Sequence, residues 1–383
     1  MAIDLVAEAA RLAPEAAARA DEIEKARRIP ADLSHQFAAA GLYRMFVPSA
    51  YGGLEASPVE GVRAFETLAR ADASCAWVVF IGATSGTLLT RLPPDVARTV
   101  FPTPETLITG VFAPTGRAEH HGREFHVTGR WQWGSGAQNA QWIAGGCVII
   151  DNGEPVTTRS GAPQNHMLLF RADQVELLDT WHVSGLRGTG SLDYEVKGLM
   201  VPEGFAAGYL VRESPPAPLY QFPQFTFLAL GIAAVALGIA RGAIDDLVAL
   251  ASHKTRAGST TPLAARAYTQ MEVAEAEARL RSARAFYYET LEAAWARAVA
   301  GDSVPVATRA DLRLATTHAV QAATGVVDAM YTLAGGSSVY ESSALQRRFR
   351  DVHVATQHIM VAPTTLETVG RLLLGVEANT TML

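Results

Sequence analysis

Residues 129–146 read Gly-Arg-Trp-Gln-Trp-Gly-Ser-Gly-Ala-Gln-Asn-Ala-Gln-Trp-Ile-Ala-Gly-Gly, a stretch that holds Trp131, Trp133 and Trp142 in a chain with six tryptophans. Trp131 and Trp133 alternate with other residues, which is typical of a strand with one buried face. The glycines beside Ser135 let a flat ligand approach the backbone, because glycine has no Cβ. The stretch therefore predicts either core aromatics beside a glycine turn or one wall of a site for a planar heterocycle.

The sequence around this stretch divides into three blocks, which together predict an α+β protein. Residues 1–104 show helical spacing and predict an all-α domain. Residues 105–206 alternate and carry turn signals at short intervals, which predicts a compact antiparallel β domain, barrel or sandwich. Residues 207–383 return to a helical period in four long segments, the last over residues 345–374, and predict a four-helix bundle. No Gly-x-Gly-x-x-Gly motif leads from a strand into a helix, so a Rossmann site is not expected.

Composition limits the possible partners and the compartment. The 383 residues are 49% hydrophobic and 18% charged, enough for a large buried core. A net charge of −6 without a long basic run argues against nucleic acid as a partner. Cys75 and Cys147 are too few for a disulfide framework or a zinc knuckle, which fits a reducing cytoplasm. The longest apolar run, residues 225–240, is shorter than the roughly 20 residues that span a bilayer, so a buried helix and no membrane are expected.

The order of the three blocks resembles the acyl-CoA dehydrogenase superfamily, and five segments across the chain are similar to its motifs. They are residues 41–53, residues 129–142, residues 185–191 with 201–203, residues 334–336 and the pair Arg350-Asp351. Four segments further resemble its flavin-dependent monooxygenase branch, which includes the 4-hydroxyphenylacetate and steroid-phenol hydroxylases. These segments are residues 72–77, 113–118, 179–191 and 346–358.

The resemblance separates two chemistries by the presence of a carboxylate base. A dehydrogenase of this fold needs a glutamate that removes the α-proton of an acyl thioester. Residues 352–366 and 225–230, which correspond to the usual base positions, contain no acid, and His358 lies in the first of them. The resemblance therefore implies a monooxygenase that uses O2 and reduced FMN or FAD from a flavin reductase, through a C4a-hydroperoxide. An aromatic or polycyclic substrate is expected between the β domain and the bundle.

The resemblance also implies roles for individual residues. Ser135 corresponds to the hydroxyl placed against flavin N5 and O4, and His358, with a reference pKa near 6.5, is suited to proton transfer. Both have plainer interpretations, a turn serine and a packing histidine. The remaining cofactor-binding candidates are Trp133 beside the ring, and Arg256, Gln270, Gly335 and Gly336, which correspond to positions that touch phosphates or adenine across a subunit boundary. An ordinary surface salt bridge is the alternative for Arg256.

Two other functions stay open, and the family implies an assembly. The chain could be an acyl-CoA dehydrogenase with a relocated base such as Glu341, or a silent flavin-binding scaffold. No metal is expected, because His353 and His358 are five residues apart and project in different directions on a helix. Arg350 and Asp351 are interpreted as a structural ion pair between bundle helices. A homotetramer with the bundles at its centre is implied by the resemblance.

Overall fold

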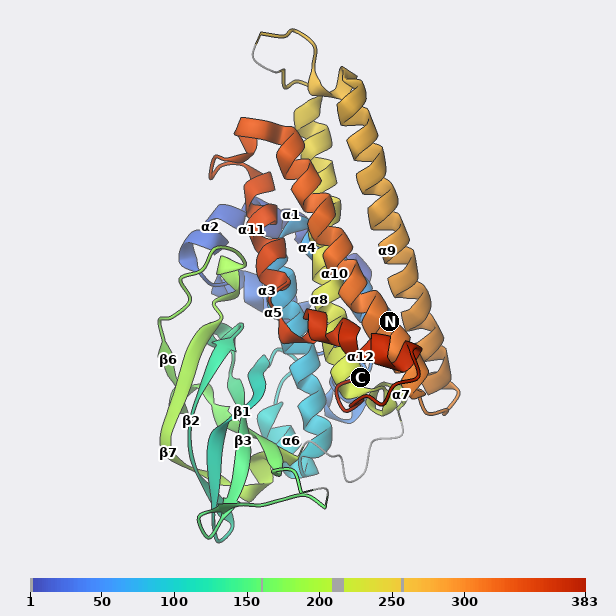
Figure 1. Ribbon diagram of the computed structural model, residues 1–383. Coiled ribbons are helices and arrows are strands. Elements are labelled where there is room, and N and C mark those ends of the chain that lie inside the picture. The colour runs from blue at the N-terminus through green and yellow to red at the C-terminus, as the bar shows by residue number, and fades with distance from the viewer. Residues whose placement is uncertain (1–2, 160, 209–216, 256–257) are drawn as a thin grey trace.

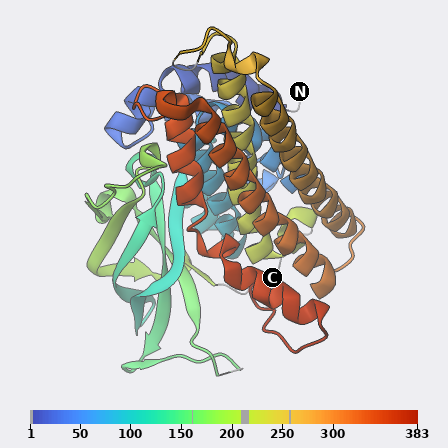
Figure 2. The same ribbon diagram turned by 45° about the horizontal axis from the view of Figure 1, so that its top comes forward.

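The computed structural model describes residues 3–159, 161–208, 217–255 and 258–383. One β-sheet lies at one side of the molecule, and the N-terminal helices and the long helices of the bundle lie together beside it (Figures 1 and 2). The N-terminal helices are α1 (Leu5–Ala18), α2 (Ala20–Ala26), α3 (Ala31–Ala39), α4 (Pro58–Ala71), α5 (Ala73–Ser85) and α6 (Pro94–Val100). Helix α5 is buried almost all round because it packs against β1 on one side and α8 on the other.

The sheet has the strand order β6-β7-β2-β1-β3-β5-β8, with β4 paired to β3. Its strands are β1 (Ile108–His121), β2 (Glu124–Gly134), β3 (Trp142–Asp151), β4 (Glu154–Pro155), β5 (Asn165–Arg171), β6 (Glu176–Leu178), β7 (Leu192–Pro202) and β8 (Ala206–Gly208). The sheet is mixed, because β1 and β3 are parallel while the other pairs are antiparallel. The parallel pair arises because the chain crosses from β2 to the far side of β1, which the turn signals did not reveal.

The bundle is built from α8 (Gln224–Ala251), α9 (Ala267–Val299), α10 (Val306–Ala334) and a C-terminal segment, with the short α7 (Pro218–Gln221) before it. The C-terminal segment is not the single helix expected over residues 345–374. It is divided into α11 (Ala344–Ala355) and α12 (Pro363–Leu373) by the 3-10 turn η9 (Ile359–Val361). Pro363 explains the break, because the residue before a proline is forced out of the helical region, and Ala362 has ψ 156°.

The apolar run alone underestimated the length of helix α8. It is 28 residues long, and its length and composition, like those of residues 73–91, would be sufficient to cross a membrane. In the protein, 89% of the apolar stretch of α8 and 83% of the apolar stretch in residues 73–91 are buried. Core helices show the same properties, so these two segments are weak evidence for a membrane span.

The contact between α4 and α8 depends on a glycine. A Cβ added at Gly238 would lie 2.5 Å from the carbonyl oxygen of Glu66 and 2.6 Å from the Cβ of Ala69. Gly238→Ala is therefore expected to lower the free energy of unfolding by about 1–3 kcal/mol, because the two backbones must separate. Chemical denaturation measures this.

The matched control for this prediction is Gly370→Ala in α12. No atom lies within 4 Å of the added Cβ at Gly370, so this change is expected to be neutral or to stabilise by up to ~1 kcal/mol through helix propensity. Equal effects of the two substitutions would contradict the argument from the α4–α8 contact.

Candidate functional site

The two tryptophans at the end of β2 do not share a face. Trp131 is fully buried, stacks on Tyr194 with ring centroids 5.2 Å apart and donates its indole N–H to the Gly146 carbonyl at 2.7 Å. Trp133 has φ 68° and is 67% exposed, because the pairing of β2 with β7 shifts register between Trp131 and Gly134. The expected alternation is therefore wrong at this point. Trp131 is a core residue, whereas Trp133 is presented at the wall of a cavity.

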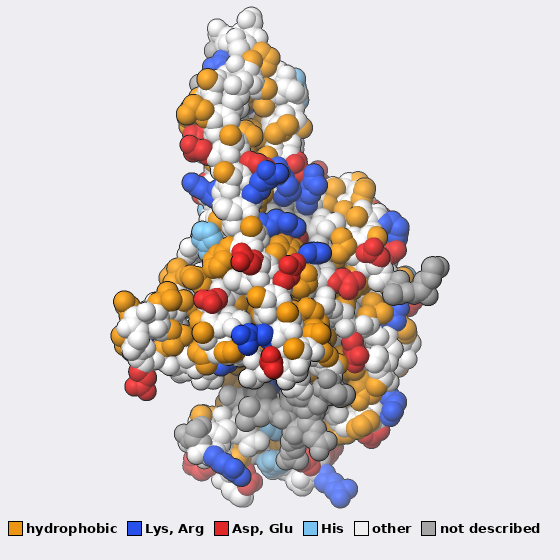
Figure 3. Space-filling view, turned by 90° about the vertical axis from the view of Figure 1, so that its right-hand side faces the viewer, with side chains coloured by type: hydrophobic (Ala, Val, Ile, Leu, Met, Phe, Trp, Pro, Cys, Tyr) orange, Lys and Arg blue, Asp and Glu red, His pale blue; other side chains and the backbone are white. Residues whose placement is uncertain are grey.

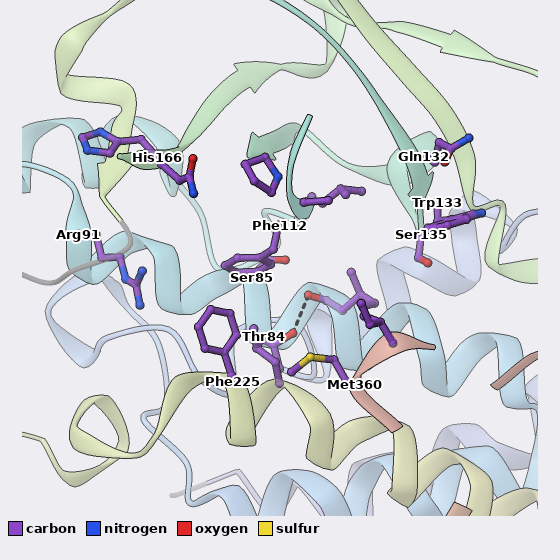
Figure 4. A pocket seen from close by; sticks show the side chains of 18 of the residues that line it. Thr84, Ser85, Arg91, Phe112, Gln132, Trp133, Ser135, His166, Phe225 and Met360 are labelled. Atoms are coloured by element: carbon purple, nitrogen blue, oxygen red, sulfur yellow. Dashed lines mark hydrogen bonds between the residues drawn. The ribbon is translucent and has the colours of Figure 1, made fainter. Parts of the chain in front are cut away.

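This cavity has a volume of about 2470 Å³ and is enclosed by α5, β1, β2, the turn η5 (Arg187–Thr189), α8 and η9. Its described walls are largely apolar. Figure 4 shows Trp133 and Ser135 at one end, Arg91 and His166 at the other, and Phe112 and Phe225 between them. Single drug-sized ligands occupy roughly 300–1,000 Å³, so the cavity has room for two organic molecules side by side.

Ser135 is 6% exposed and belongs to a chain of hydroxyl groups on the cavity wall. Its Oγ accepts the indole N–H of Trp77 at 3.2 Å and lies 2.7 Å from Ser191 Oγ. Ser191 Oγ lies 2.6 Å from Thr189 Oγ1, which donates to the Leu186 carbonyl at 2.8 Å. The chain thus connects α5, β2 and the loop before β7, which are far apart in the sequence.

The Leu186 end of this chain is fixed by α11. The backbone N–H of Leu186, which has φ 49°, donates to Asp351 Oδ1 at 2.6 Å. Burial raises the pKa of Asp351 to about 7. Arg350 pairs instead with Glu24 at 2.7 Å. The expected ion pair between bundle helices is therefore wrong, because Arg350 and Asp351 each join α11 to another part of the fold.

His358 occupies the break between α11 and α12 and lines the same cavity. As the N-cap of η9 it accepts the backbone N–H of Met360 at Nδ1, 3.2 Å away, and its ring lies 5.9 Å from that of Trp77. Burial, with a smaller contribution from the charge of Arg313, lowers the pKa of His358 to about 4. A neutral ring whose Nδ1 accepts must carry its proton on Nε2, so this side chain has a hydrogen-bond donor left for a ligand.

Arg313 of α10 is a buried cation that sequence reasoning did not single out. It is 3% exposed and donates to Thr365 Oγ1 at 3.3 Å, and within the described part of the chain its Nε and Nη1 have no hydrogen-bond partner. Burial lowers its pKa to about 10, so the guanidinium remains charged near neutral pH. Its charge is one reason that the ring of His358 stays neutral.

The predicted site residues fall into two groups. Ser135, Trp133 and His358 line one cavity. Gln270, whose side chain donates to the Ala264 carbonyl at 2.9 Å, and the Gly335-Gly336 pair in the turn η8 (Gly335–Ser338) do not line it. A role for these three across a subunit boundary stays a prediction, and Arg256 lies outside the described residues.

The described part of the cavity lining offers no buried carboxylate as the base that a dehydrogenase would need. Among its described lining residues, Glu203 is the one carboxylate, and that side chain is exposed. Glu341 lines a separate polar cleft beside Arg347. The described residues also contain no group of three histidine, cysteine, aspartate or glutamate side chains that could hold a metal ion.

Comparison with known families agrees with this architecture. Residues 3–92 match the model of the acyl-CoA dehydrogenase N-terminal domain, and residues 230–363 match that of the C-terminal domain. These segments cover more than half of the chain, which therefore belongs to the acyl-CoA dehydrogenase superfamily.

Within this superfamily the chain is a flavin-dependent monooxygenase. It is 35% identical to the indole-3-acetate monooxygenase of Pseudomonas putida, over 94% of this chain and 90% of the relative. It is 28% identical to the flavin-dependent monooxygenase oxygenase subunit HsaA of Rhodococcus jostii, over 91% and 92% of the two chains. The solved structure of XiaF from Streptomyces, in complex with FADH2 and glycerol, superposes with a TM-score of 0.90 at 25% identity, covering 97% of this chain and 95% of XiaF.

Proposed function

We propose that this protein is the oxygenase component of a two-component system that hydroxylates an aromatic or polycyclic substrate with O2 and reduced flavin. One observation carries the proposal: Ser135 and His358 line one large cavity whose described lining residues include no buried carboxylate that could act as a base. The alternative function, an acyl-CoA dehydrogenase with a relocated base, would need such a carboxylate within reach of the substrate.

The chemistry of the cavity wall fits a flavin ring. Ser135 Oγ uses one lone pair for Trp77 and its proton within the hydroxyl chain, which leaves one acceptor position for a polar ring edge. Trp133 presents a broad exposed ring beside it (Figure 4). Either FMN or FAD satisfies these features, because they concern the ring and not the nucleotide tail.

The protein groups have separable roles in this proposal. Bound reduced flavin would supply the electrons that activate O2. The apolar side chains of Phe112, Phe225 and Met360 would exclude water from the reacting atoms. The Nε2–H of His358 would donate a hydrogen bond to an oxygen atom of the substrate or of O2, and Ser135 would hold the ring edge of the flavin.

The far end of the cavity favours an aromatic substrate with a polar substituent. Arg91 is held there by hydrogen bonds to the Gly208 carbonyl, at 3.1 Å, and to the side chain of Gln224. His166 lies beside it in Figure 4. The P. putida relative is named for indole-3-acetate, an aromatic acid, and a cationic end suits such a carboxylate.

Further parts of the proposal concern partners and compartment. The R. jostii relative is named as an oxygenase subunit, which supports a separate flavin reductase here. Hydrophobic side chains lie among charged ones on the face seen in Figure 3. Helix α9 carries the exposed Tyr268, Met271 and Val299. They support a homotetramer built through the bundle, which light scattering would measure. Two buried free cysteines suit a cytoplasmic protein.

An isotope experiment tests the proposed function. The purified protein, a flavin reductase, NADH and either FMN or FAD are incubated under 18O2 with indole-3-acetate and with 4-hydroxyphenylacetate. We expect one 18O atom in the product of at least one substrate. Reduction of protein-bound FAD by acyl-CoA substrates, with no 18O incorporation, would instead identify a dehydrogenase. Flavin binding with neither reaction would identify a silent scaffold.

A further inference from the structure

The hydroxyl chain behind Ser135 has two ends of opposite kind. At one end, the indole nitrogen of Trp77 can only donate a hydrogen bond, and it donates to Ser135 Oγ. At the other end, the Leu186 carbonyl can only accept. It accepts from Thr189 Oγ1 at the shortest distance, 2.8 Å, and also from the backbone N–H of Thr189 at 3.1 Å and the indole N–H of Trp181 at 3.2 Å. Ser191 lies between Ser135 and Thr189 and within hydrogen-bond distance of both.

These ends determine where each hydroxyl proton points. Thr189 gives its single proton to the Leu186 carbonyl, so Ser191 must give its proton to Thr189. Ser135 must then give its proton to Ser191. As a result, Ser135 has no proton left for the cavity and presents a lone pair to it.

We propose that Ser191 and Thr189 fix Ser135 as a hydrogen-bond acceptor and thereby make the site select reduced over oxidised flavin. The inference rests on the proposed function, in which Ser135 holds the ring edge of the flavin, and on the family resemblance, which implies that this hydroxyl lies against N5. In reduced flavin N5 carries a hydrogen and donates, whereas in oxidised flavin N5 is an acceptor. Two acceptors that face each other repel. Oxidised flavin therefore needs a proton from Ser135, which is released only if the Ser135–Ser191 bond breaks or if every hydrogen bond in the hydroxyl chain reverses its direction.

The size of the selection follows from one neutral hydrogen bond. Reversing the chain removes the Thr189 bond to Leu186, and breaking it at Ser135 leaves the Ser191 oxygen without that donor. A net hydrogen bond of this kind changes an equilibrium constant roughly 2- to 10-fold. Ser191 and Thr189 act through Ser135 and are positioning residues.

The test compares the dissociation constants of oxidised and reduced FMN and FAD. Titrations are followed by flavin absorbance and fluorescence, and the reduced form is held under anaerobic conditions. They give the ratio of the dissociation constant of oxidised flavin to that of reduced flavin. In Ser191→Ala the proton of Ser135 is released toward the cavity. We expect oxidised flavin to bind roughly 2- to 10-fold more tightly and reduced flavin to change little, so that the ratio falls.

Three further variants separate this effect from simple loss of structure. Thr189→Val should lower the ratio in the same direction, and Thr189→Ser, which keeps the hydroxyl, should restore it. Thr109→Val is the matched control, because Thr109 is a fully buried residue whose Oγ1 has no hydrogen-bond partner among the described residues, and its methyl group lies near Gly136, the residue after Ser135. It should leave the ratio unchanged.

The outcomes distinguish this inference from the proposed function. The inference alone would be overturned if the wild-type protein incorporates 18O and the ratio of flavin dissociation constants is the same in Ser191→Ala and Thr189→Val as in the wild type. Equal weakening of both flavin forms in Ser191→Ala would also overturn it, because that result indicates a structural role. A wild-type protein that binds neither form would overturn both proposals.

Discussion

Replacing His358 with asparagine is expected to lower the rate of substrate hydroxylation at least ~100-fold, whereas glutamine should retain a larger share of the rate. Positioned proton donors and acceptors contribute roughly 10²–10⁴-fold to rates. Asparagine can still accept the Met360 N–H, but its side chain ends near the position of Nδ1 and places no donor where Nε2–H lies. The amide nitrogen of glutamine reaches farther and can donate there. Single-turnover measurements of product and of released H2O2 would check this.

The control for this prediction is His353→Asn. His353 lies five residues before His358, in α11, but its Nε2 lies 3.1 Å from Asp328 Oδ1 and the residue does not line the cavity. Its replacement should leave hydroxylation nearly unchanged. Full hydroxylation in His358→Asn would show that His358 is a packing residue, and a greater loss in glutamine than in asparagine would contradict the role of Nε2–H.

The shifted pKa of His358 gives this residue a defined pH dependence. Because the pKa falls from 6.5 in the unfolded chain to about 4 in the folded one, the ring stays neutral at pH values where an exposed histidine is half charged. The unfolded state binds the proton first, so stability from this group is complete above pH 6.5 and is lost as the pH falls toward 4. His358 should therefore contribute no step near pH 6.5 to the pH profile of the hydroxylation rate. Any step seen there in the wild type should also be present in His358→Gln.

The arrangement of blocks could be predicted because it depends on periodic patterns. The change from a helical to an alternating period near residue 105, and back near residue 207, corresponds to the transitions between α6 and β1 and between β8 and α7. The match of the family models to both helical parts confirmed the superfamily. The parallel pairing of β1 with β3 could not be predicted, because a crossover leaves no periodic signal.

The cavity was predictable only in part. Ser135 and His358 were predicted as site residues from their motifs, and both line the cavity, but their catalytic roles stay predictions. The tautomer of His358 depends on a break at Pro363 and on the Met360 N–H. The exposure of Trp133 depends on a positive φ that few non-glycine residues adopt, so a period-2 pattern could not predict it. The partners of Ser135 lie 58 positions before it and 56 positions after it. Long-range hydrogen bonds of this kind have no local sequence signature.

Replacing Glu24 with alanine is expected to lower the free energy of unfolding by about 2–3 kcal/mol. Its carboxylate, at the end of α2, binds Arg187 at 3.1 Å, Arg347 at 2.8 Å and Arg350 at 2.7 Å. It therefore joins the N-terminal helices, the loop that ends the hydroxyl chain, and α11. The substitution leaves three guanidinium groups close together without their shared anion. The expected loss is below that of a fully buried pair, because Arg187 is 40% exposed.

The pKa of Glu24 predicts the pH range in which this stabilisation is lost. Burial raises the pKa, but the hydrogen bonds and charges of Arg347 and Arg350 outweigh burial and hold it below the usual value of 4.5. The stabilisation is thus fully present above pH 4.5 and is lost as the pH falls through the lower folded-state value. Urea denaturation at pH 7 and pH 3 should show a smaller difference between Glu24→Ala and wild type at the lower pH.

A neighbouring carboxylate provides the control for the Glu24 prediction. Glu22, also in α2, pairs with Arg19 at 2.8 Å on the surface, with 53% of its side chain exposed. Glu22→Ala should change stability little, because exposed pairs are screened by water and salt. Equal effects of the two substitutions would show that charge removal from α2, and not the shared contact with three arginines, is responsible.

Because Arg187 follows Leu186 directly, Glu24→Ala should also loosen the carbonyl that orders Ser135, and should lower the preference for reduced flavin together with stability.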